Sequence, residues 1–237
     1  MKRTSSCICG ALAVLMLVAG AAAAEKPTVG VAEFTNSARA HWWYAGVGWD
    51  LADTLTNEMA SLGSFTIVER AKLQPVLMEQ DLAASGRIAR GTGAKIGKLT
   101  GAKYLVMGSV SSYEENTKGG GGGIGFKGVR LGGKKSDAYI AVDLRVVDTT
   151  TGEVKYTRSV EARAASKGFN VGLSRGGFSG NMNKFNKTPH GKAIRAVIIE
   201  ITDYLDCAMV QQDSCMAEYD AKESRRREKT KGSVKIE

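Results

Sequence analysis

Few residues of this chain have the types and spacing that catalysis or metal binding requires. The 237 residues include two histidines, His41 and His190, which lie far apart and have no cysteine or carboxylate nearby at metal-ligand spacing. Gly123, Gly125 and Gly128 match the G-x-G-x-x-G pattern of nucleotide-binding loops. That pattern functions between a strand and a helix, whereas a strand is expected to follow here. We therefore expect no enzymatic activity, no metal and no cofactor.

The first 24 residues have the pattern of a secretory signal peptide. A basic Met1-Lys2-Arg3 precedes an apolar run at residues 11–18, and alanines at 21–24 form a small-residue cleavage site. We expect cleavage near Ala24 and an exported mature protein that starts at Glu25. Ala21 stands where a lipoprotein signal carries its cysteine, so we expect no lipid anchor.

Two cysteines remain once the leader is removed, because Cys7 and Cys9 belong to it. Cys207 and Cys215 follow a predicted helix, and an oxidising compartment favours a short-loop disulfide between them. Two free thiols are the alternative interpretation.

Two glycine-rich stretches, at about residues 113–138 and 164–188, alternate apolar and polar residues as the arms of β-hairpins do. In a membrane, the apolar positions of such arms face lipid. The alternative is a pair of mobile surface loops. The apolar positions are Ile124, Phe126, Val129, Leu131, Phe169, Val171, Leu173, Phe178 and Met182.

The charge of the chain is basic and concentrated on these two stretches. Lys and Arg outnumber Asp and Glu by 33 to 24, a formal net charge of +9, and no acidic residue lies between Glu115 and Asp137 or between Glu161 and Glu200. A basic patch can indicate nucleic acid. Export and the lack of interleaved aromatic side chains argue against nucleic acid and favour anionic lipid headgroups or an acidic passenger.

Elsewhere, periodicity predicts alternating strands and helices. The second helix is expected to bury Leu73, Val76, Leu77 and Leu82. Residues 25–221 then form one domain, and the charged tail at 222–237 is expected to be disordered. The predicted strands are 28–34, 65–68, 104–110, 138–147 and 154–162, and the predicted helices are 48–62, 72–84, 92–100 and 193–209.

Several stretches resemble the CsgG family, the curli-secretion channels. They are FTIVER at 65–70, YLVMGSV at 104–110, IAVDLRVV at 140–147 and TGE at 151–153. The resemblance extends over residues 28–205 and is most specific between residues 104 and 153. Members of the family are outer-membrane proteins that form rings, in which each protomer adds two β-hairpins to one shared barrel. Unfolded fibre subunits diffuse through the barrel to the cell surface.

The resemblance also implies a pore constriction. In the family, a loop after the first strand narrows the channel with stacked aromatic and amide side chains. The matching loop here spans residues 35–44, so Trp42, Trp43 and Tyr44 are the constriction candidates, together with Asn36. In the alternative interpretation, these aromatic side chains pack against a neighbouring subunit or cap the core.

Together these features predict an α/β fold: a three-layer-like periplasmic α/β domain with two inserted amphipathic β-hairpins that can form a shared oligomeric β-barrel. Only closure into a barrel satisfies the backbone groups of strands in lipid. The predicted function is a passive outer-membrane pore of a Gram-negative-type bacterium, formed by a homo-oligomer ring that exports fibre or surface-adhesin subunits. The alternative is a soluble periplasmic assembly module whose basic hairpins bind a partner or lipopolysaccharide; an enzyme comes third.

Overall fold

The computed structural model describes residues 25–119, 125–126, 129–130, 134–165 and 188–234. The predicted leader lies outside these residues. Phe126 and Val129 lie in two short strands, β5 (Gly125–Phe126) and β6 (Val129–Arg130), which pair with each other. The other predicted lipid-facing positions lie outside the described residues: Ile124, Leu131, Phe169, Val171, Leu173, Phe178 and Met182.

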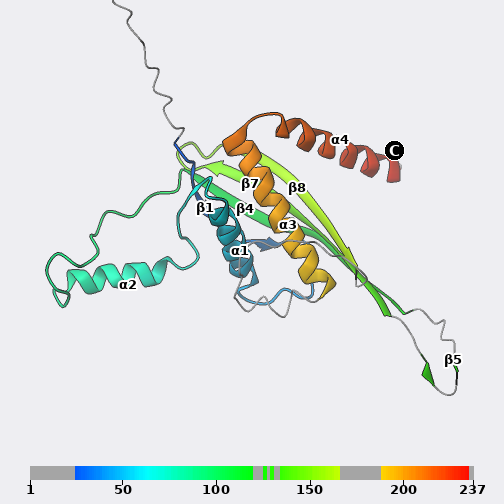
Figure 1. The fold of residues 1–237 in the computed structure, drawn as a ribbon, viewed down its shortest axis with the longest axis horizontal. Helices are drawn as coiled ribbons and strands as arrows, with labels where there is room; N and C mark the ends of the chain where they lie inside the picture. Colours follow the sequence, from blue (N-terminus) through cyan, green and yellow to red (C-terminus); the bar gives the residue numbers. More distant parts are fainter. Residues whose placement is uncertain (1–24, 120–124, 127–128, 131–133, 166–187, 235–237) are drawn as a thin grey trace, which may run out of the picture.

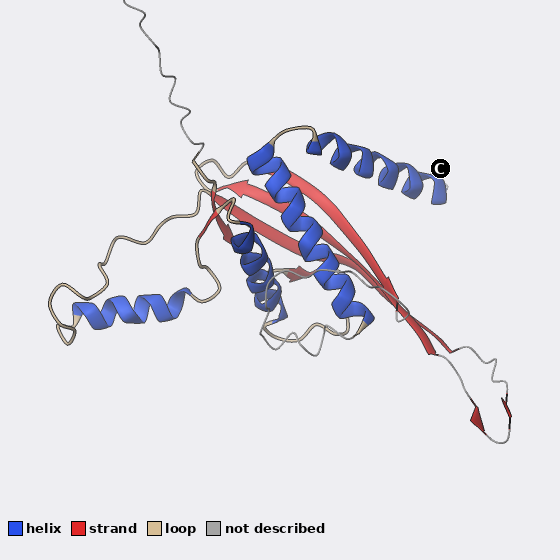
Figure 2. Cartoon of the chain, in the orientation of Figure 1, coloured by secondary structure: helices blue, strands red, loops and turns tan. Residues whose placement is uncertain are grey.

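A mixed sheet forms the centre of the domain, with its main strands in the order β3-β1-β4-β7-β8 (Figures 1 and 2). β1 pairs in parallel with β3 and β4, whereas β4, β7 and β8 form an antiparallel meander. The short β2 also pairs in parallel with β4. The strands are β1 (Thr28–Val31), β2 (Thr35–Asn36), β3 (Thr66–Ile67), β4 (Tyr104–Gly119), β7 (Lys134–Asp148) and β8 (Val154–Ala165).

Two helices, α1 (Val47–Leu62) and α3 (Pro189–Asp206), pack on one face of this sheet and against each other (Figure 1). Their apolar side chains recur every three or four residues and are buried, as expected for amphipathic helices. Phe34 lies over β4 at Gly108, where an added Cβ would come within 2.2 Å of the Phe34 ring. The large aliphatic and methionine side chains buried on these helices are Val47, Leu51, Leu55 and Met59 in α1, and Ile194, Val197, Ile198, Ile201 and Leu205 in α3.

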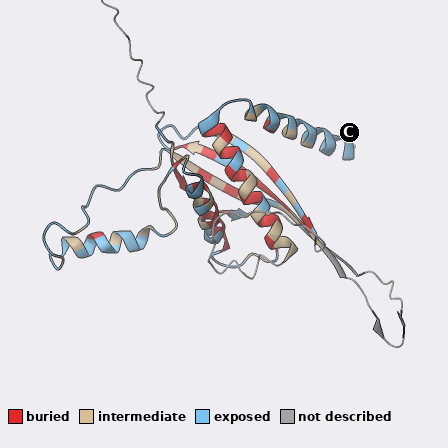
Figure 3. Cartoon of the chain, in the orientation of Figure 1, coloured by how far each residue is buried: buried red, intermediate tan, exposed pale blue. Residues whose placement is uncertain are grey.

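The helix predicted at residues 72–84 is present as α2 (Leu73–Ala84), but its predicted core face is wrong. Val76 and Leu82 are each 40% exposed, and the buried residue of α2 is Gln80. Figures 1 and 3 show α2 standing apart from the sheet, with most of its surface exposed. The described elements therefore form two layers, one of helices and one open sheet, whereas three layers were predicted.

The short helix predicted at residues 92–100 is also wrong, since the chain there runs in turns and irregular backbone. Gly91 and Gly97 adopt left-handed conformations, with φ of 83° and 75°. Glycine takes this conformation readily and is a poor helix former, so the two glycines interrupt any right-handed helix.

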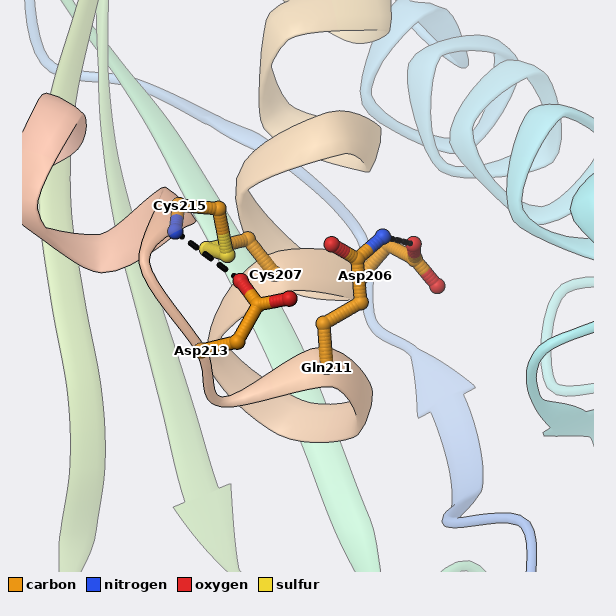
Figure 4. The surroundings of a disulfide bond; sticks show 5 residues. All are labelled: Asp206, Cys207, Gln211, Asp213 and Cys215. Atoms are coloured by element: carbon orange, nitrogen blue, oxygen red, sulfur yellow. Dashed lines mark hydrogen bonds between the residues drawn. A yellow bond between two sulfur atoms is a disulfide. The ribbon is translucent and has the colours of Figure 1, made fainter.

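A disulfide joins Cys207 and Cys215, whose Cα atoms are 6.0 Å apart (Figure 4). It closes the turn between a short π-helical segment, η2 (Cys207–Gln211), and the last helix, α4 (Cys215–Ser233). The Asp213 carboxylate accepts a hydrogen bond of 2.9 Å from the Cys215 N–H, which begins α4. The two cysteines that survive the predicted leader are thus paired in the structure.

The tail predicted to be disordered from residue 222 is helical as far as Ser233, because α4 has two sources of stability. Along the helix, Glu223 forms ion pairs with Arg226 at 2.7 Å and Arg227 at 3.2 Å, a spacing that supports helices. Against the domain, Tyr219 packs edge-on to Tyr204, with ring centroids 5.3 Å apart.

Replacement of Tyr219 by alanine tests whether this contact holds α4 on the domain. Tyr219 is 9% exposed, and the Arg158 guanidinium lies 5.2 Å from its ring centroid. We expect Tyr219→Ala to lower the free energy of unfolding by about 3 kcal/mol in urea titrations, the range for truncating a buried aromatic side chain. Tyr44→Ala, at a residue 51% exposed, should cost less than about 1 kcal/mol. Equal losses in the two variants would contradict the proposed role of Tyr219.

Candidate functional site at the base of the ribbon

The loop that carries the predicted constriction residues is held in place by its own amide side chain. Asn36 ends β2, which pairs with β4 through the register Asn36↔Val110. Its side-chain Oδ1 accepts a 3.0 Å hydrogen bond from the Ala40 N–H, and its Nδ2 donates a 3.3 Å bond to the Ala40 carbonyl. Ala40 is buried, so this double contact fixes the backbone just before the aromatic residues.

Trp42 is the centre of an aromatic cluster that joins this loop to β4 and α3. Its ring lies edge-on to Tyr113 at 5.6 Å and nearly parallel to His190 at 6.5 Å between centroids. Trp43 is tilted against Trp42 at 5.6 Å, and His41 is edge-on to Tyr113 at 5.5 Å. Aromatic pairs at these distances attract each other beyond their burial of surface.

The cluster lies where both predicted insertions leave the domain. We call the outer ends of β4 and β7, residues 113–119 and 134–140, the ribbon; its pairs run from Tyr113↔Ile140 to Gly119↔Lys134. Tyr113 begins the ribbon. His190 lies in the first turn of α3, directly after the second insertion, where the Thr188 hydroxyl accepts a 3.2 Å hydrogen bond from the Gly191 N–H and caps the helix. The aromatic cluster thus ties together the bases of both insertions.

Two polar contacts accompany the ring contacts. The Tyr113 hydroxyl donates a 3.1 Å hydrogen bond to Glu115, and burial, followed by this bond, raises the pKa of Tyr113. Tyr113 therefore stays neutral and donates. His41 Nε2 lies 3.5 Å from the same carboxylate, on the solvent side of the cluster. The Trp42 indole N–H is buried without an acceptor among the described residues.

The predicted constriction residues share one loop but face different surroundings. Trp42 and Trp43 are partly buried against the core of their own domain. Tyr44 is 51% exposed and donates a 3.3 Å hydrogen bond to Asp50. Sequence reasoning missed Tyr113, Glu115 and His190 as partners of this loop. The feature of the sequence that could have indicated them is that each lies next to one of the two glycine-rich stretches.

The described part of the chain offers no arrangement for metal chemistry, since no three His, Cys, Asp or Glu side chains lie close enough to hold an ion. Among the described helices, none combines the length and apolar character needed to cross a bilayer. In the described residues, ring and backbone contacts hold the loop against β4 and α3.

His190 gives the cluster a pH dependence that can be measured. Burial is the main cause that lowers the pKa of His190, while Glu115 raises it and His41 lowers it to smaller extents. The unfolded chain therefore takes up this proton at a higher pH than the folded chain, and stability decreases as pH falls below about 6.5. We expect urea titrations of His190→Gln to lose less stability between about pH 7 and pH 5.5 than the wild type. An unchanged pH dependence in this variant would assign the effect to other groups.

Comparison with known proteins places the chain in a family. A family model described as "Curli production assembly/transport component CsgG" matches residues 11–234. The CsgG proteins of Salmonella typhimurium strain LT2 and Escherichia coli strain K12 are each 35% identical to it over 94 residues. Each match covers 38% of this chain, and the chain spans about a third (34%) of the length of each of these curated relatives.

Among solved structures, protein CT253 from Chlamydia trachomatis is similar with a TM-score of 0.45 and 14% identity, over 79% of this chain and 99% of that one. Lipoprotein GNA1162 from Neisseria meningitidis is similar with a TM-score of 0.38 and 16% identity, over 75% and 99% of the two chains. The family match extends over most of the sequence and includes every described strand and helix. The chain therefore belongs to the CsgG family of curli production assembly/transport components.

Proposed function

We propose that this chain assembles into a homo-oligomeric ring whose ribbons together form a pore in the outer membrane, and that unfolded fibre or surface-adhesin subunits pass through it without catalysis. One observation carries the proposal. Both insertions leave the domain from the same end of the sheet, because the end of β8 pairs beside the ribbon through Asp137↔Ala165 and α3 begins at the aromatic cluster. In this proposal, the arms predicted at residues 164–188 extend beside the ribbon into one wall.

The exposed edges of the ribbon supply the physical reason for assembly. Beyond Asp137↔Ala165, β4 and β7 pair with each other as far as Gly119↔Lys134, and no other described strand pairs with them there (Figure 1). Open strand edges are intolerable in lipid, whereas neighbouring copies around a closed ring satisfy every backbone group. Membrane insertion and oligomerisation therefore form one event in this proposal.

The aromatic loop lies at the membrane-proximal end of the domain in this arrangement. Trp42 and Trp43 hold the loop against the domain, and Asn36 uses its amide on Ala40. Among the predicted constriction residues, Tyr44 is more than half exposed, and its side chain is the one that we propose reaches a central channel. The proposed constriction is thus a ring of Tyr44 side chains. Trp42 and Trp43 pack the loop against the domain, and the Asn36 amide fixes its backbone at Ala40.

A second function, a soluble periplasmic assembly module for a surface structure, is favoured by one observation. The contacts of Trp42 with Tyr113 and His190 are satisfied within a single copy and need no pore. A module of this kind would remain a folded monomer in solution and would not insert its ribbon in a bilayer.

Single-channel recordings from a planar bilayer separate the two functions. The mature protein from Glu25 onward should give large, stable conductance steps, and Tyr44→Ala should enlarge them because a side chain is removed from the narrowest ring. The matched control is Trp49→Ala, which removes an exposed aromatic side chain of α1 (37% exposed) outside the loop and should leave the conductance unchanged.

A silent bilayer with a folded monomer in solution would reject the pore and support the soluble module. Conductance that is the same in Tyr44→Ala and the wild type would reject Tyr44 as the constriction and leave the pore itself standing.

A further inference from the structure

A basic segment with exposed apolar side chains projects from the end of the domain that is remote from the ribbon (Figure 1). We define the basic segment as residues 85–103, between α2 and β4. No Asp or Glu occurs between Asp81 and Glu114, whereas the segment carries Arg87, Arg90, Lys95, Lys98 and Lys103. The first four of these cations form no ion pair with any described residue.

Large apolar side chains accompany these charges. Ile96 is 64% exposed and Leu99 is 46% exposed, and on the adjoining α2 Met78 is 62% exposed. Figure 3 shows that this part of the molecule is exposed nearly throughout. Exposed large apolar side chains on one segment are typical of an interaction surface, since isolated domains rarely expose many of them together.

An acidic cleft of about 250 Å³ lies between the end of α3, η2 and the start of α4. Asp203, Asp206 and Glu218 line it, and its cation, Lys222, is already paired with Glu200 at 3.1 Å and with Glu218 at 3.3 Å. Val210 of η2, next to the lining residue Gln211, is 39% exposed.

The negative charge of the acidic cleft is not neutralised within the described part of one copy. Burial, followed by repulsion from Glu200, Glu58 and Asp206, raises the pKa of Asp203. Asp206 accepts a hydrogen bond from Gln211 through Oδ2, but its Oδ1 is buried without a donor among the described residues (Figure 4). A buried acceptor without a partner costs free energy that an incoming donor recovers.

We propose that the basic segment of one copy docks in the acidic cleft of a second copy, and that this contact joins neighbours in the ring. The inference rests on the assembly proposed above and names one of its interfaces. Arg and Lys side chains supply the donors that the cleft lacks, and Ile96 and Leu99 cover Val210. Among the described residues of one copy, no ion pair joins the basic segment to the acidic cleft, so both surfaces are open to a second copy.

The placement of the two surfaces favours a second copy over a lipid bilayer. In Figure 1, α2 and the junction of α3 with α4 lie toward one end of the molecule, and the ribbon points out of the other. Copies whose ribbons run side by side would present the basic segment and the acidic cleft at the same level, away from the membrane. A contact between two different surfaces repeats head to tail, and it closes into a ring when its rotation permits.

Charge reversal on each side, followed by mixing, tests this contact in the mature protein from Glu25 onward. The first variant carries Arg87→Glu, Arg90→Glu, Lys95→Glu and Lys98→Glu, and the second carries Asp203→Lys and Glu218→Lys. Light scattering after size exclusion in detergent measures the mass. We expect each variant alone to dissociate about 100-fold more readily than the wild type, because like charges then meet. An equimolar mixture should recover large assemblies, since opposite charges again face each other wherever the two variants alternate.

The matched control is Lys229→Glu with Lys231→Glu, which reverses exposed charges at the end of α4 and should leave the mass unchanged. Recovery on mixing supports the contact, since a misfolded variant would not be rescued. Oligomers that survive in the first variant, or a mixture that stays dissociated, would overturn it. A first variant that keeps its mass but no longer cosediments with phosphatidylglycerol vesicles would also overturn it and assign the basic segment to a membrane.

The pore and the contact fail in different ways. A mixture that assembles but conducts no current would reject the pore and keep the contact. Normal conductance in the first variant would reject the contact and keep the pore.

Discussion

The antiparallel ladder between β4 and β7 is the constraint on which the rest of the domain depends. Its register runs from Tyr104↔Asp148 in the core to Gly119↔Lys134 in the ribbon, with one irregularity between Val110 and Ser112. The inner half is flanked by β1 and β8 and covered by helices, whereas the outer end has neither neighbouring described strands nor covering helices. One pair of strands therefore belongs both to a stable core and to a segment with unsatisfied edges. The core fixes the direction in which the ribbon points.

The aromatic cluster holds the start of the ribbon against the loop and α3. Trp42 contacts Tyr113 on the ribbon and His190 at the start of α3, so one side chain touches a residue next to each predicted insertion. Because protein interiors are densely packed, Tyr113 and His190 cannot move far without changing their contacts with the loop. The loop and the base of the ribbon are thus in direct contact within a single copy.

Much of the fold could be predicted because its signals are local. The apolar repeat of Leu51, Leu55 and Met59 identifies α1, and all three side chains are buried. The repeat of Leu73, Val76 and Leu77 is equally clear, yet α2 does not pack on the sheet. Periodicity shows that a helix has an apolar side, but it does not show which surface covers that side.

The remaining differences have similar causes. The charged residues after residue 221 predict disorder, whereas the partners that hold α4 in place lie far away in sequence, as Arg158 and Tyr204 do for Tyr219. For the candidate site, the loop residues could be found from sequence, but Tyr113 and His190 could not be assigned to it. They are 71 and 148 positions from Trp42, and the fold alone brings them together.

The disulfide between Cys207 and Cys215 has a consequence for timing. It holds η2 against the start of α4 and so shapes the acidic cleft. Thiols stay reduced in the cytosol and are oxidised after export. In the proposed assembly, the bond that shapes the cleft forms only in an oxidising compartment, so the contact between copies follows export. The order of events in that proposal is then export, disulfide formation and ring closure.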